Sequence, residues 1–430
     1  MQKRLYTFFL LAMLVLSSAC VSNGGNSSDA SNANINTVYA AEPSATPAAE
    51  SAAAASPRSS STTVPTETPA TSATSSPTPS PTTSPTPSPA EQLLASMTLD
   101  DKISQLFFLA FRQDANGANI TEVNGEIRGV LENHAIGGVI LFSENIETKE
   151  QTQKYVSGLQ ALAKIPLFIG IDEEGGRVLR TSALDVPRIP AALKIGASGD
   201  PRNAYDAAQT IAGYLSPLGV NLDFAPVADV FTNPDNTVIG DRAFSTDADT
   251  AAGFVVQFVA GLQDNGLSAC LKHFPGHGDT ATDSHYGLAE TDRTLDELTA
   301  REFIPFEKGI DAGADFVMVG HIAAPLVTGN DDPATFSPLM MSILRDTLGF
   351  GGVIITDSLQ MGAVSVTSGE AAVRAFSAGA DMLLMPDDFD EAFTAIKDAV
   401  DDEKISIERL DQSVLRILEL KEKKGMLAGD

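Results

Sequence analysis

The sequence alternates between short apolar runs and longer segments whose apolar residues have helical spacing. The apolar runs occupy residues 105–111, 137–142, 166–172, 220–226, 268–274, 316–321, 352–357 and 382–386. Near-continuous apolar runs of this length indicate strands buried on both faces, as in a parallel sheet covered by helices. Residues 149–164, 296–313 and 405–425 have the apolar spacing of amphipathic helices.

Predicted strands that alternate with predicted helices favour one fold. No second linker interrupts residues 91–430, so we interpret them as a single α/β domain. Eight strands in a domain of this length favour a (β/α)8 barrel of the TIM type over a doubly wound sheet. No glycine-rich GxGxxG turn follows the first predicted strand, which weakens a dinucleotide-binding alternative.

The first ninety residues differ from the rest in composition. Residues 1–20 combine a basic start, an uncharged apolar stretch and small residues before Cys20, the features of a secretory signal. The placement of Cys20 resembles that of the lipid-modified cysteine of a bacterial lipoprotein, and ordinary cleavage is the alternative. Residues 21–90 are rich in Ser, Thr, Ala and Pro, which predicts a disordered linker. We expect an extracytoplasmic domain, anchored to the bacterial cell membrane as a lipoprotein or else secreted.

Charge and cysteine content limit the partners. The formal net charge is −28, whereas nucleic acid and anionic lipid both require a basic protein surface, so neither is expected as a partner. The two cysteines, Cys20 and Cys270, provide no disulfide framework if Cys20 is lipidated. The domain would then depend on its hydrophobic core, and we expect a monomer.

Charged residues follow several of the predicted strands. They occupy residues 172–180, Asp223, residues 272–285, His321 and Asp357. Because the carboxyl ends of barrel strands converge on one mouth, these residues predict a polar pocket. The densest stretch, KHFPGHGDTATDSH at 272–285, holds three of the chain's five histidines. Such a density of titratable groups is more typical of an active-site loop than of a polar turn.

Glycoside cleavage is the first chemistry that fits these residues. It requires a carboxylate and an acid on opposite sides of the scissile bond. Asp357 is the candidate carboxylate, with a helix N-cap as its alternative role. His285 is the candidate acid because imidazole titrates near neutral pH, and Asp283 is close enough in sequence to orient the ring.

Two other kinds of site are also compatible with the loop. Metal-assisted hydrolysis would use His273, His277, Asp279 and His285 as ligands. The proline and glycine between the first two histidines, and the adjacent lysine, disfavour a metal ion. The remaining alternative is a membrane-tethered sugar-binding protein without catalysis.

Three long segments of the sequence resemble a known family. They are KHFPGHGDT at 272–280 followed by DSH at 283–285, DEEGGRVLR at 172–180, and IITDSLQMGA at 354–363. Together they resemble glycoside hydrolase family 3, and within it the branch of bacterial β-N-acetylhexosaminidases that act on cell-wall fragments. The resemblance extends over residues 91–430 with the motifs in the family's order.

The resemblance implies a (β/α)8 barrel and a retaining mechanism without metal or organic cofactor. Asp357 would attack the anomeric carbon, and His285, paired with Asp283, would serve as acid and then base. His277 and Asp279 are then interpreted as residues that shape the loop. Arg242 has a competing structural role, pairing with its neighbour Asp241 or with a nearby loop. The sugar-binding positions implied by the family are Asp172, Arg180, Arg242, Lys272 and His273.

The expected activity is exo-acting removal of terminal β-linked N-acetylglucosamine, from peptidoglycan-derived fragments. The DSH loop marks this branch, whereas β-glucosidase relatives take a glutamate acid from a second domain. Because a histidine acid does not repel an anionic acceptor, an N-acetylglucosaminide phosphorylase is an alternative, as is a β-glucosidase. Ser358 departs from the Asp or Ala of other members, which affects fine tuning rather than the nucleophile.

Overall fold

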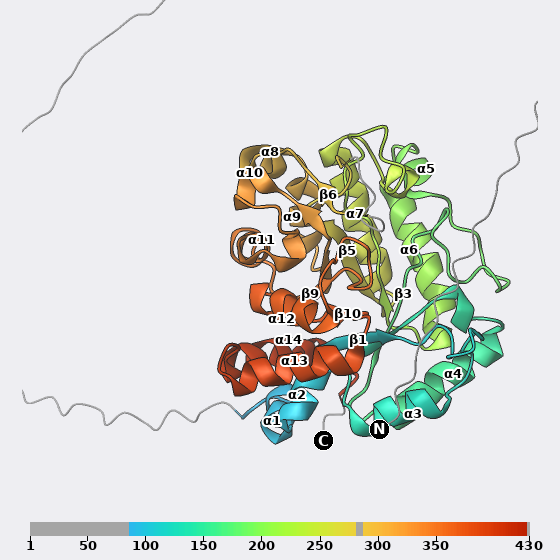
Figure 1. Ribbon diagram of the computed structural model, residues 1–430. Helices are drawn as coiled ribbons and strands as arrows, with labels where there is room; N and C mark the ends of the chain where they lie inside the picture. Colours follow the sequence, from blue (N-terminus) through green and yellow to red (C-terminus); the bar gives the residue numbers. More distant parts are fainter. Residues whose placement is uncertain (1–85, 281–286, 428–430) are drawn as a thin grey trace, which may run out of the picture. The chain divides into compact units, whose positions relative to one another are not determined.

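The computed structural model describes residues 86–280 and 287–427. In this part of the chain, eight parallel strands form one sheet in the order β10-β1-β2-β3-β4-β5-β7-β9 (Figure 1). The strands are β1 (Phe107–Ala110), β2 (Gly138–Leu141), β3 (Phe168–Ile171), β4 (Leu222–Asp223), β5 (Ser268–Phe274), β7 (Phe316–Val319), β9 (Val353–Thr356) and β10 (Leu383–Leu384).

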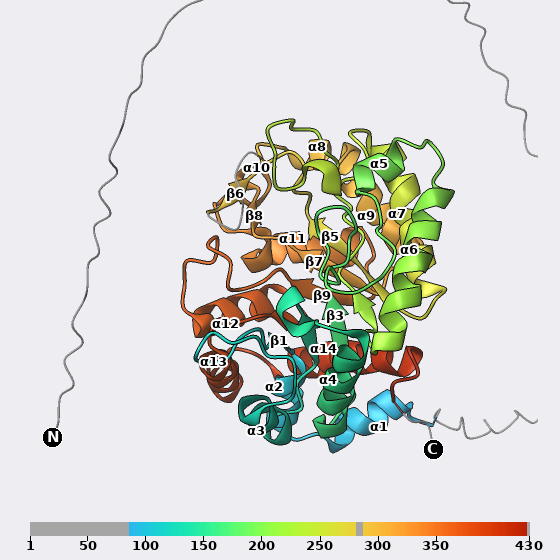
Figure 2. The same ribbon diagram turned by 90° about the vertical axis from the view of Figure 1, so that its right-hand side faces the viewer.

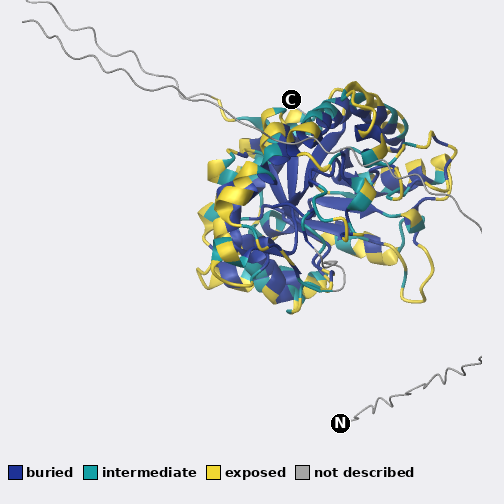
Figure 3. Ribbon diagram, turned by 90° about the horizontal axis from the view of Figure 1, so that it is seen from above, coloured by how far each residue is buried: buried dark blue, intermediate teal, exposed yellow. Residues whose placement is uncertain are grey.

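The two ends of the sheet approach each other. A parallel bridge joins Ile355 of β9 to Met382, directly before β10. The Thr356 N–H donates to the Met382 carbonyl over 3.1 Å. The result is a nearly closed eight-stranded parallel barrel, consistent with the predicted TIM type, whose buried strands lie inside a partly exposed layer of helices (Figure 3).

Helices of the described residues surround the sheet (Figure 2). They are α1 (Pro89–Ser96), α2 (Leu99–Gln105), α3 (Gly125–Asn133), α4 (Lys149–Leu162), α5 (Ala192–Gly196), α6 (Arg202–Leu215), α7 (Ala248–Gln263), α8 (Leu295–Ala300), α9 (Phe303–Asp311), α10 (Pro325–Thr328), α11 (Pro338–Ser342), α12 (Ser368–Ala378), α13 (Phe389–Asp401) and α14 (Ile407–Lys423). Shorter elements are the 3-10 turns η1 (Ser143–Asn145), η2 (Ser216–Leu218), η3 (Gly240–Arg242) and η4 (Ala334–Phe336), the π-helical turn η5 (Ile343–Thr347), and a second small sheet of β6 (Ala289–Glu290) and β8 (Ile322–Ala323).

The ends of the covering helices follow from local sequence. Asp247, Thr367 and Ser406 each accept a hydrogen bond from the third residue of the helix that follows, α7, α12 and α14 respectively. These residue types are favoured N-caps because their short side chains satisfy a backbone N–H that has no partner within the helix.

All eight predicted strands are confirmed, and each lies within its predicted apolar run. The helix predicted at residues 149–164 is confirmed as α4, and the one at 405–425 as α14. The prediction of one helix at 296–313 is wrong, because α8 and α9 break at Arg301, whose φ is −145°. Pro305 explains the break, since a proline ring clashes with the carbonyl four residues earlier in a continuous helix.

Phenylalanine rings fill the barrel. The rings of Phe168 (β3) and Phe316 (β7), on strands that are not neighbours in the sheet, lie 5.2 Å apart between centroids, and those of Phe108 (β1) and Phe224 lie 5.4 Å apart. Gly170 makes room for them, because a Cβ there would lie 2.7 Å from the Phe224 ring and 2.9 Å from the Phe108 ring. Alternating large and small residues give the packed interior that a barrel of eight strands requires.

The predicted signal peptide, the linker and Cys20 lie outside the described residues. Within them, no helix combines the length and apolarity needed to cross a membrane.

A buried lysine closes the amino end of the barrel. Lys421 of α14 donates from Nζ to Oε1 of Gln105 over 2.8 Å and lies 5.3 Å from the centre of the Phe168 ring. The Gln105 Nε2 group donates to the carbonyls of Ala135 and Ile136, which fixes the amide so that its oxygen faces the lysine. Burial lowers the pKa of Lys421 to about 7.

This lysine makes stability depend on pH in a defined direction. Between a folded pKa of about 7 and the ordinary value of 10.5, the unfolded chain binds more protons than the folded chain. The contribution of Lys421 to the free energy of unfolding therefore rises with pH by up to about 1.4 kcal/mol per unit in this window. In Lys421→Met this contribution disappears, so the stability difference between the two proteins changes with pH.

The measurement is urea unfolding of both proteins at pH 7, 8.5 and 10. Lys404→Met is the matched control, because Lys404 is 70% exposed and its ion pair with Asp402, over 3.0 Å, lies on the surface. A constant difference between Lys421→Met and wild type at all three pH values contradicts the prediction.

Candidate active site

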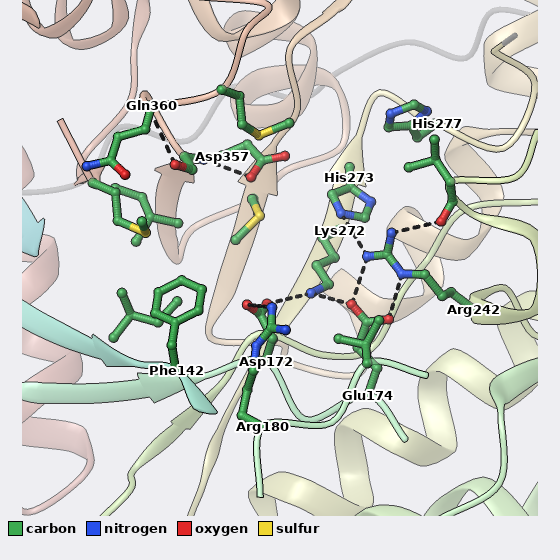
Figure 4. Close-up of a pocket in the computed structure, with 18 of the residues that line it drawn as sticks. Phe142, Asp172, Glu174, Arg180, Arg242, Lys272, His273, His277, Asp357 and Gln360 are labelled. Atoms are coloured by element: carbon green, nitrogen blue, oxygen red, sulfur yellow. Dashed lines mark hydrogen bonds and ion pairs between the residues drawn. The ribbon is translucent and has the colours of Figure 1, made fainter. Parts of the chain in front are cut away.

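A pocket of about 400 Å³ opens at the carboxyl ends of the barrel strands (Figure 4). Its polar side carries charged side chains such as Lys272, Glu174 and Arg242, and Asp357 and Gln360 lie across the pocket from them. The polar side chains are Arg112, Asp172, Glu174, Arg180, Arg242, Lys272, His273, His277, Asp357, Ser358 and Gln360. The apolar ones are Ile140, Phe142, Val178, Val238, Met318, Met361, Leu384 and Met385.

The polar side is a continuous network of ion pairs. Lys272 of β5 lies with Nζ 2.9 Å from Oδ1 of Asp172 and 2.6 Å from Oε1 of Glu174. Glu174 also binds Arg242 through two hydrogen bonds of 2.8 Å. Arg180 donates from Nη2 to Oδ2 of Asp172 over 3.0 Å. All five predicted sugar-binding residues line the pocket, and four of them belong to this network.

The network keeps its members charged although they are buried. Burial by itself would raise the pKa of Glu174, but Arg242 and Lys272 outweigh it and hold the pKa well below the usual range. The same balance, with Lys272 and Arg180 as partners, lowers the pKa of Asp172. Burial would lower the pKa of Lys272, and the two carboxylates raise it instead. Each group therefore remains a fixed charge at neutral pH.

His273 is oriented by a residue that the sequence analysis missed. Its Nδ1 lies 2.8 Å from Oδ2 of Asp229, and its Nε2 lies 3.4 Å from Nη2 of Arg242. A guanidinium can only donate, so Nε2 accepts and Nδ1 donates to Asp229. Asp229 Oδ1 also accepts from the backbone N–H of His277 over 2.7 Å. The sequence feature that could have indicated Asp229 as a site residue is its position as a lone carboxylate in the apolar segment after β4.

In the described part of the histidine-rich stretch, Asp279 and His277 have structural partners. Asp279 accepts hydrogen bonds from Nε and Nη2 of Arg293 at 2.7 and 3.0 Å, as expected for a residue that shapes the loop. His277 contacts Oγ1 of Thr280 through Nδ1 at 2.6 Å, and burial lowers its pKa. Within residues 86–280 and 287–427, no three His, Cys, Asp or Glu side chains come together as metal ligands.

Asp357 follows β9 and faces the pocket, as predicted. Its backbone N–H donates to the Val319 carbonyl over 2.9 Å, and its Oδ1 accepts from the Ser358 N–H over 2.7 Å. The alternative that Asp357 caps the next helix is wrong, because α12 begins at Ser368 and Thr367 caps it. Asp283 and His285 lie outside the described residues.

Three expectations about the mouth are wrong. Arg242 does not pair with Asp241, which binds Nε of Arg177 over 3.0 Å. Asp223 and His321 are fully buried and do not line the pocket. Burial raises the pKa of Asp223 well above its usual value. The sequence analysis also missed Glu174 as a site residue, although the motif DEEGGRVLR contains it.

The fold and pocket define a barrel protein with a charged site at the carboxyl ends of its strands, and comparison with known proteins identifies the family. Residues 98–420 match the family model "Glycosyl hydrolase family 3 N terminal domain". The chain therefore belongs to glycosyl hydrolase family 3.

Named relatives lie in the same family branch. The chain is 34% identical over 337 residues to "Beta-hexosaminidase A" of Pseudoalteromonas piscicida, covering 71% of this chain but only 56% of that protein. It is 38% identical over 288 residues to "Beta-hexosaminidase" of Stenotrophomonas maltophilia, covering 64% of this chain and 84% of the relative. The chain thus spans little more than half the length of the first relative.

Solved structures agree with this placement. A glycoside hydrolase family 3 β-N-acetylglucosaminidase from Paenibacillus sp. superposes with a TM-score of 0.74 at 38% identity, over 78% of this chain and 64% of that chain. The β-glucoside phosphorylase BglX gives a TM-score of 0.71 at 26% identity, over 78% of this chain and 60% of that chain.

Glu174 provides a test of the network. Its side chain is 4% exposed and faces two cations, so Glu174→Gln leaves Arg242 and Lys272 with too little negative charge. We expect a loss of about 3–5 kcal/mol in the free energy of unfolding, the usual result of removing one partner from a buried ion pair. Urea unfolding measures it.

The matched control is Glu132→Gln, because Glu132 pairs with Arg128 on the surface and both side chains are 54% exposed. Exposed pairs contribute little, so this variant should unfold like wild type. If both substitutions change the free energy of unfolding only slightly and by the same amount, the ion pairs of Glu174 do not stabilise the fold.

Proposed function

We propose that this chain is a retaining, exo-acting β-N-acetylhexosaminidase that releases terminal β-linked N-acetylglucosamine. The observation that carries the proposal is Asp357, placed on the wall of a pocket whose opposite side is a fixed array of charged hydrogen-bonding groups. Cleavage of a glycosidic bond at the anomeric carbon requires a carboxylate near that carbon and groups that bind the hydroxyls of the sugar, and this pocket has both. The printed names of the relatives support the choice of sugar.

The charged array would bind the hydroxyl groups of one sugar ring. Asp172 accepts hydrogen bonds, whereas Lys272, Arg180 and Arg242 donate them. Because ion pairs already fix these side chains, they need little rearrangement when the substrate binds.

In the first step, Asp357 attacks the anomeric carbon through Oδ2, since Oδ1 is engaged by the Ser358 N–H. The bond to the leaving oxygen breaks as a glycosyl ester forms, and His285 gives its proton to that oxygen. In the second step His285 takes a proton from water, the water oxygen attacks the same carbon, and the Asp357 carboxylate is released. Asp283 would stabilise the protonated imidazole.

The residues before the barrel lead to a proposal on location. Residues 1–20 would export the chain, Cys20 would carry the lipid, and residues 21–90 would tether the barrel outside the cytoplasmic membrane, where peptidoglycan-derived fragments are available. Mass spectrometry of the mature N-terminus tests this, because an unmodified end at any residue other than Cys20 rules out the anchor.

A panel of 4-nitrophenyl β-glycosides tests the activity. We expect turnover of the N-acetylglucosaminide and a loss of at least about 10³-fold in kcat for Asp357→Ala, as for removal of other catalytic nucleophiles. A 5-fluoro glycoside should label wild type at Asp357, located by mass spectrometry of peptides. Conservation of the fold in Asp357→Ala is checked by its urea midpoint.

The same panel separates the alternatives. Exclusive turnover of the glucoside would indicate a β-glucosidase. The similarity to BglX makes phosphorolysis the second candidate, and a requirement for phosphate with release of a sugar phosphate would establish it. No turnover by wild type, with sugar binding retained, would indicate a sugar-binding lipoprotein.

The acid role of His285 predicts a dependence on the leaving group. In His285→Ala, substrates with basic leaving groups should lose about 10²–10⁴-fold in kcat/KM, because they need a proton as the bond breaks. Dinitrophenyl glycosides, which leave as stable anions, should lose much less in the first step. A series of aryl glycosides measures this dependence, and equal losses across the series would remove His285 from the acid role.

A further inference from the structure

Two buried side chains, His321 and Thr335, lie next to the backbone that carries Asp357. His321 contacts the Ser358 carbonyl through Nε2 at 2.9 Å, and Oγ1 of Thr335 lies 2.9 Å from His321 Nδ1. The same Thr335 oxygen lies 3.2 Å from the Val319 carbonyl, which also accepts the Asp357 N–H. His321 and Thr335 are both fully buried and do not line the pocket.

The direction of the histidine hydrogen bond follows from its partner. A carbonyl oxygen can only accept, so Nε2 of His321 must carry a hydrogen and donate it to Ser358. Thr335 meets Nδ1 on the other side of the ring. The imidazole is therefore held by the Thr335 hydroxyl at Nδ1 and by the Ser358 carbonyl at Nε2, and these contacts orient the ring.

Ser358 links His321 to the carboxylate of Asp357 through two hydrogen bonds of its backbone. Its carbonyl is held by His321, and its N–H donates to Oδ1 of Asp357 over 2.7 Å. Its side chain lines the pocket, so the segment that His321 holds is part of the pocket wall. A shift of Ser358 would release Oδ1 and let the carboxylate rotate.

We propose that His321 is a positioning residue for the nucleophile: through the Ser358 backbone it fixes which oxygen of Asp357 faces the anomeric carbon. Thr335 holds the imidazole in place for this task. The inference rests on the proposed function, because it takes Asp357 to be the nucleophile. A misplacement of about 1 Å can cost roughly a hundredfold in rate, so such a restraint is large enough to measure.

The competing role for His321 is purely structural. A histidine that only satisfies a buried carbonyl would affect stability when removed, and the chemical step would be unchanged. The two roles separate in variants that differ in a single donor. His321→Leu removes the hydrogen bond to Ser358, whereas His321→Gln keeps an N–H near the position of Nε2.

The experiment uses the full chain and the glycoside that wild type turns over. It measures the rate of covalent labelling by the 5-fluoro glycoside, kcat and KM, the inhibition constant of the free sugar product, and the urea midpoint. We expect His321→Leu to slow labelling by about ten- to a hundredfold, with the product inhibition constant within about twofold of wild type. His321→Gln should recover most of the labelling rate.

Other outcomes overturn the inference. Unchanged labelling in His321→Leu, or His321→Gln as slow as His321→Leu, shows that His321 does not position Asp357. If His321→Leu does not fold, Thr335→Val and Thr335→Ser replace it: the first should slow labelling and the second should restore it, and equal rates refute the proposal. Wild type inactive on every glycoside instead refutes the proposed function.

Discussion

None of the charges in the pocket can be buried alone, and the arrangement of the site depends on this constraint. Desolvation of an isolated ion costs several kcal/mol, and within the ion-pair network each carboxylate meets a cation and each cation a carboxylate. Lys272 is paired with both Asp172 and Glu174, and Arg242 is paired with Glu174 through two hydrogen bonds. The side chains that would bind the sugar are thus positioned before any substrate is present.

The barrel makes such a network possible because it brings distant segments to one mouth. Asp172 follows β3, Lys272 lies near the end of β5, and Asp357 follows β9. Glu173, between the two acids of the network, points away from them: it accepts from the Tyr214 hydroxyl over 2.9 Å and from the Arg180 N–H over 2.8 Å. Of these three consecutive acidic residues, Glu173 thus binds backbone and side-chain groups outside the pocket, and Asp172 and Glu174 line the pocket.

The sequence predicted what depends on runs of neighbouring residues. Apolar runs located every strand of the barrel, and the polar residues at their ends located Asp172, Lys272 and Asp357. It did not predict partners that meet only after folding: Glu174 and Arg242 are 68 residues apart, and His321 and Ser358 are 37 apart. His321 was expected at the mouth because it follows a strand. Its side chain is instead buried outside the pocket, where it contacts the carbonyl of the pocket residue Ser358.

The apolar side of the pocket is built with some backbone strain. Met385, which lines it, has a φ of +50°, unusual for a residue with a side chain, and its N–H is bound to the Phe108 carbonyl over 2.8 Å. Such conformations persist only where surrounding contacts enforce them, and they are concentrated at functional sites. With Met318 and Met361, this residue gives the pocket a flexible thioether surface opposite rigid ion pairs. The rigid side suits the hydroxyl pattern of a sugar, and the adaptable side suits its apolar ring face and substituents.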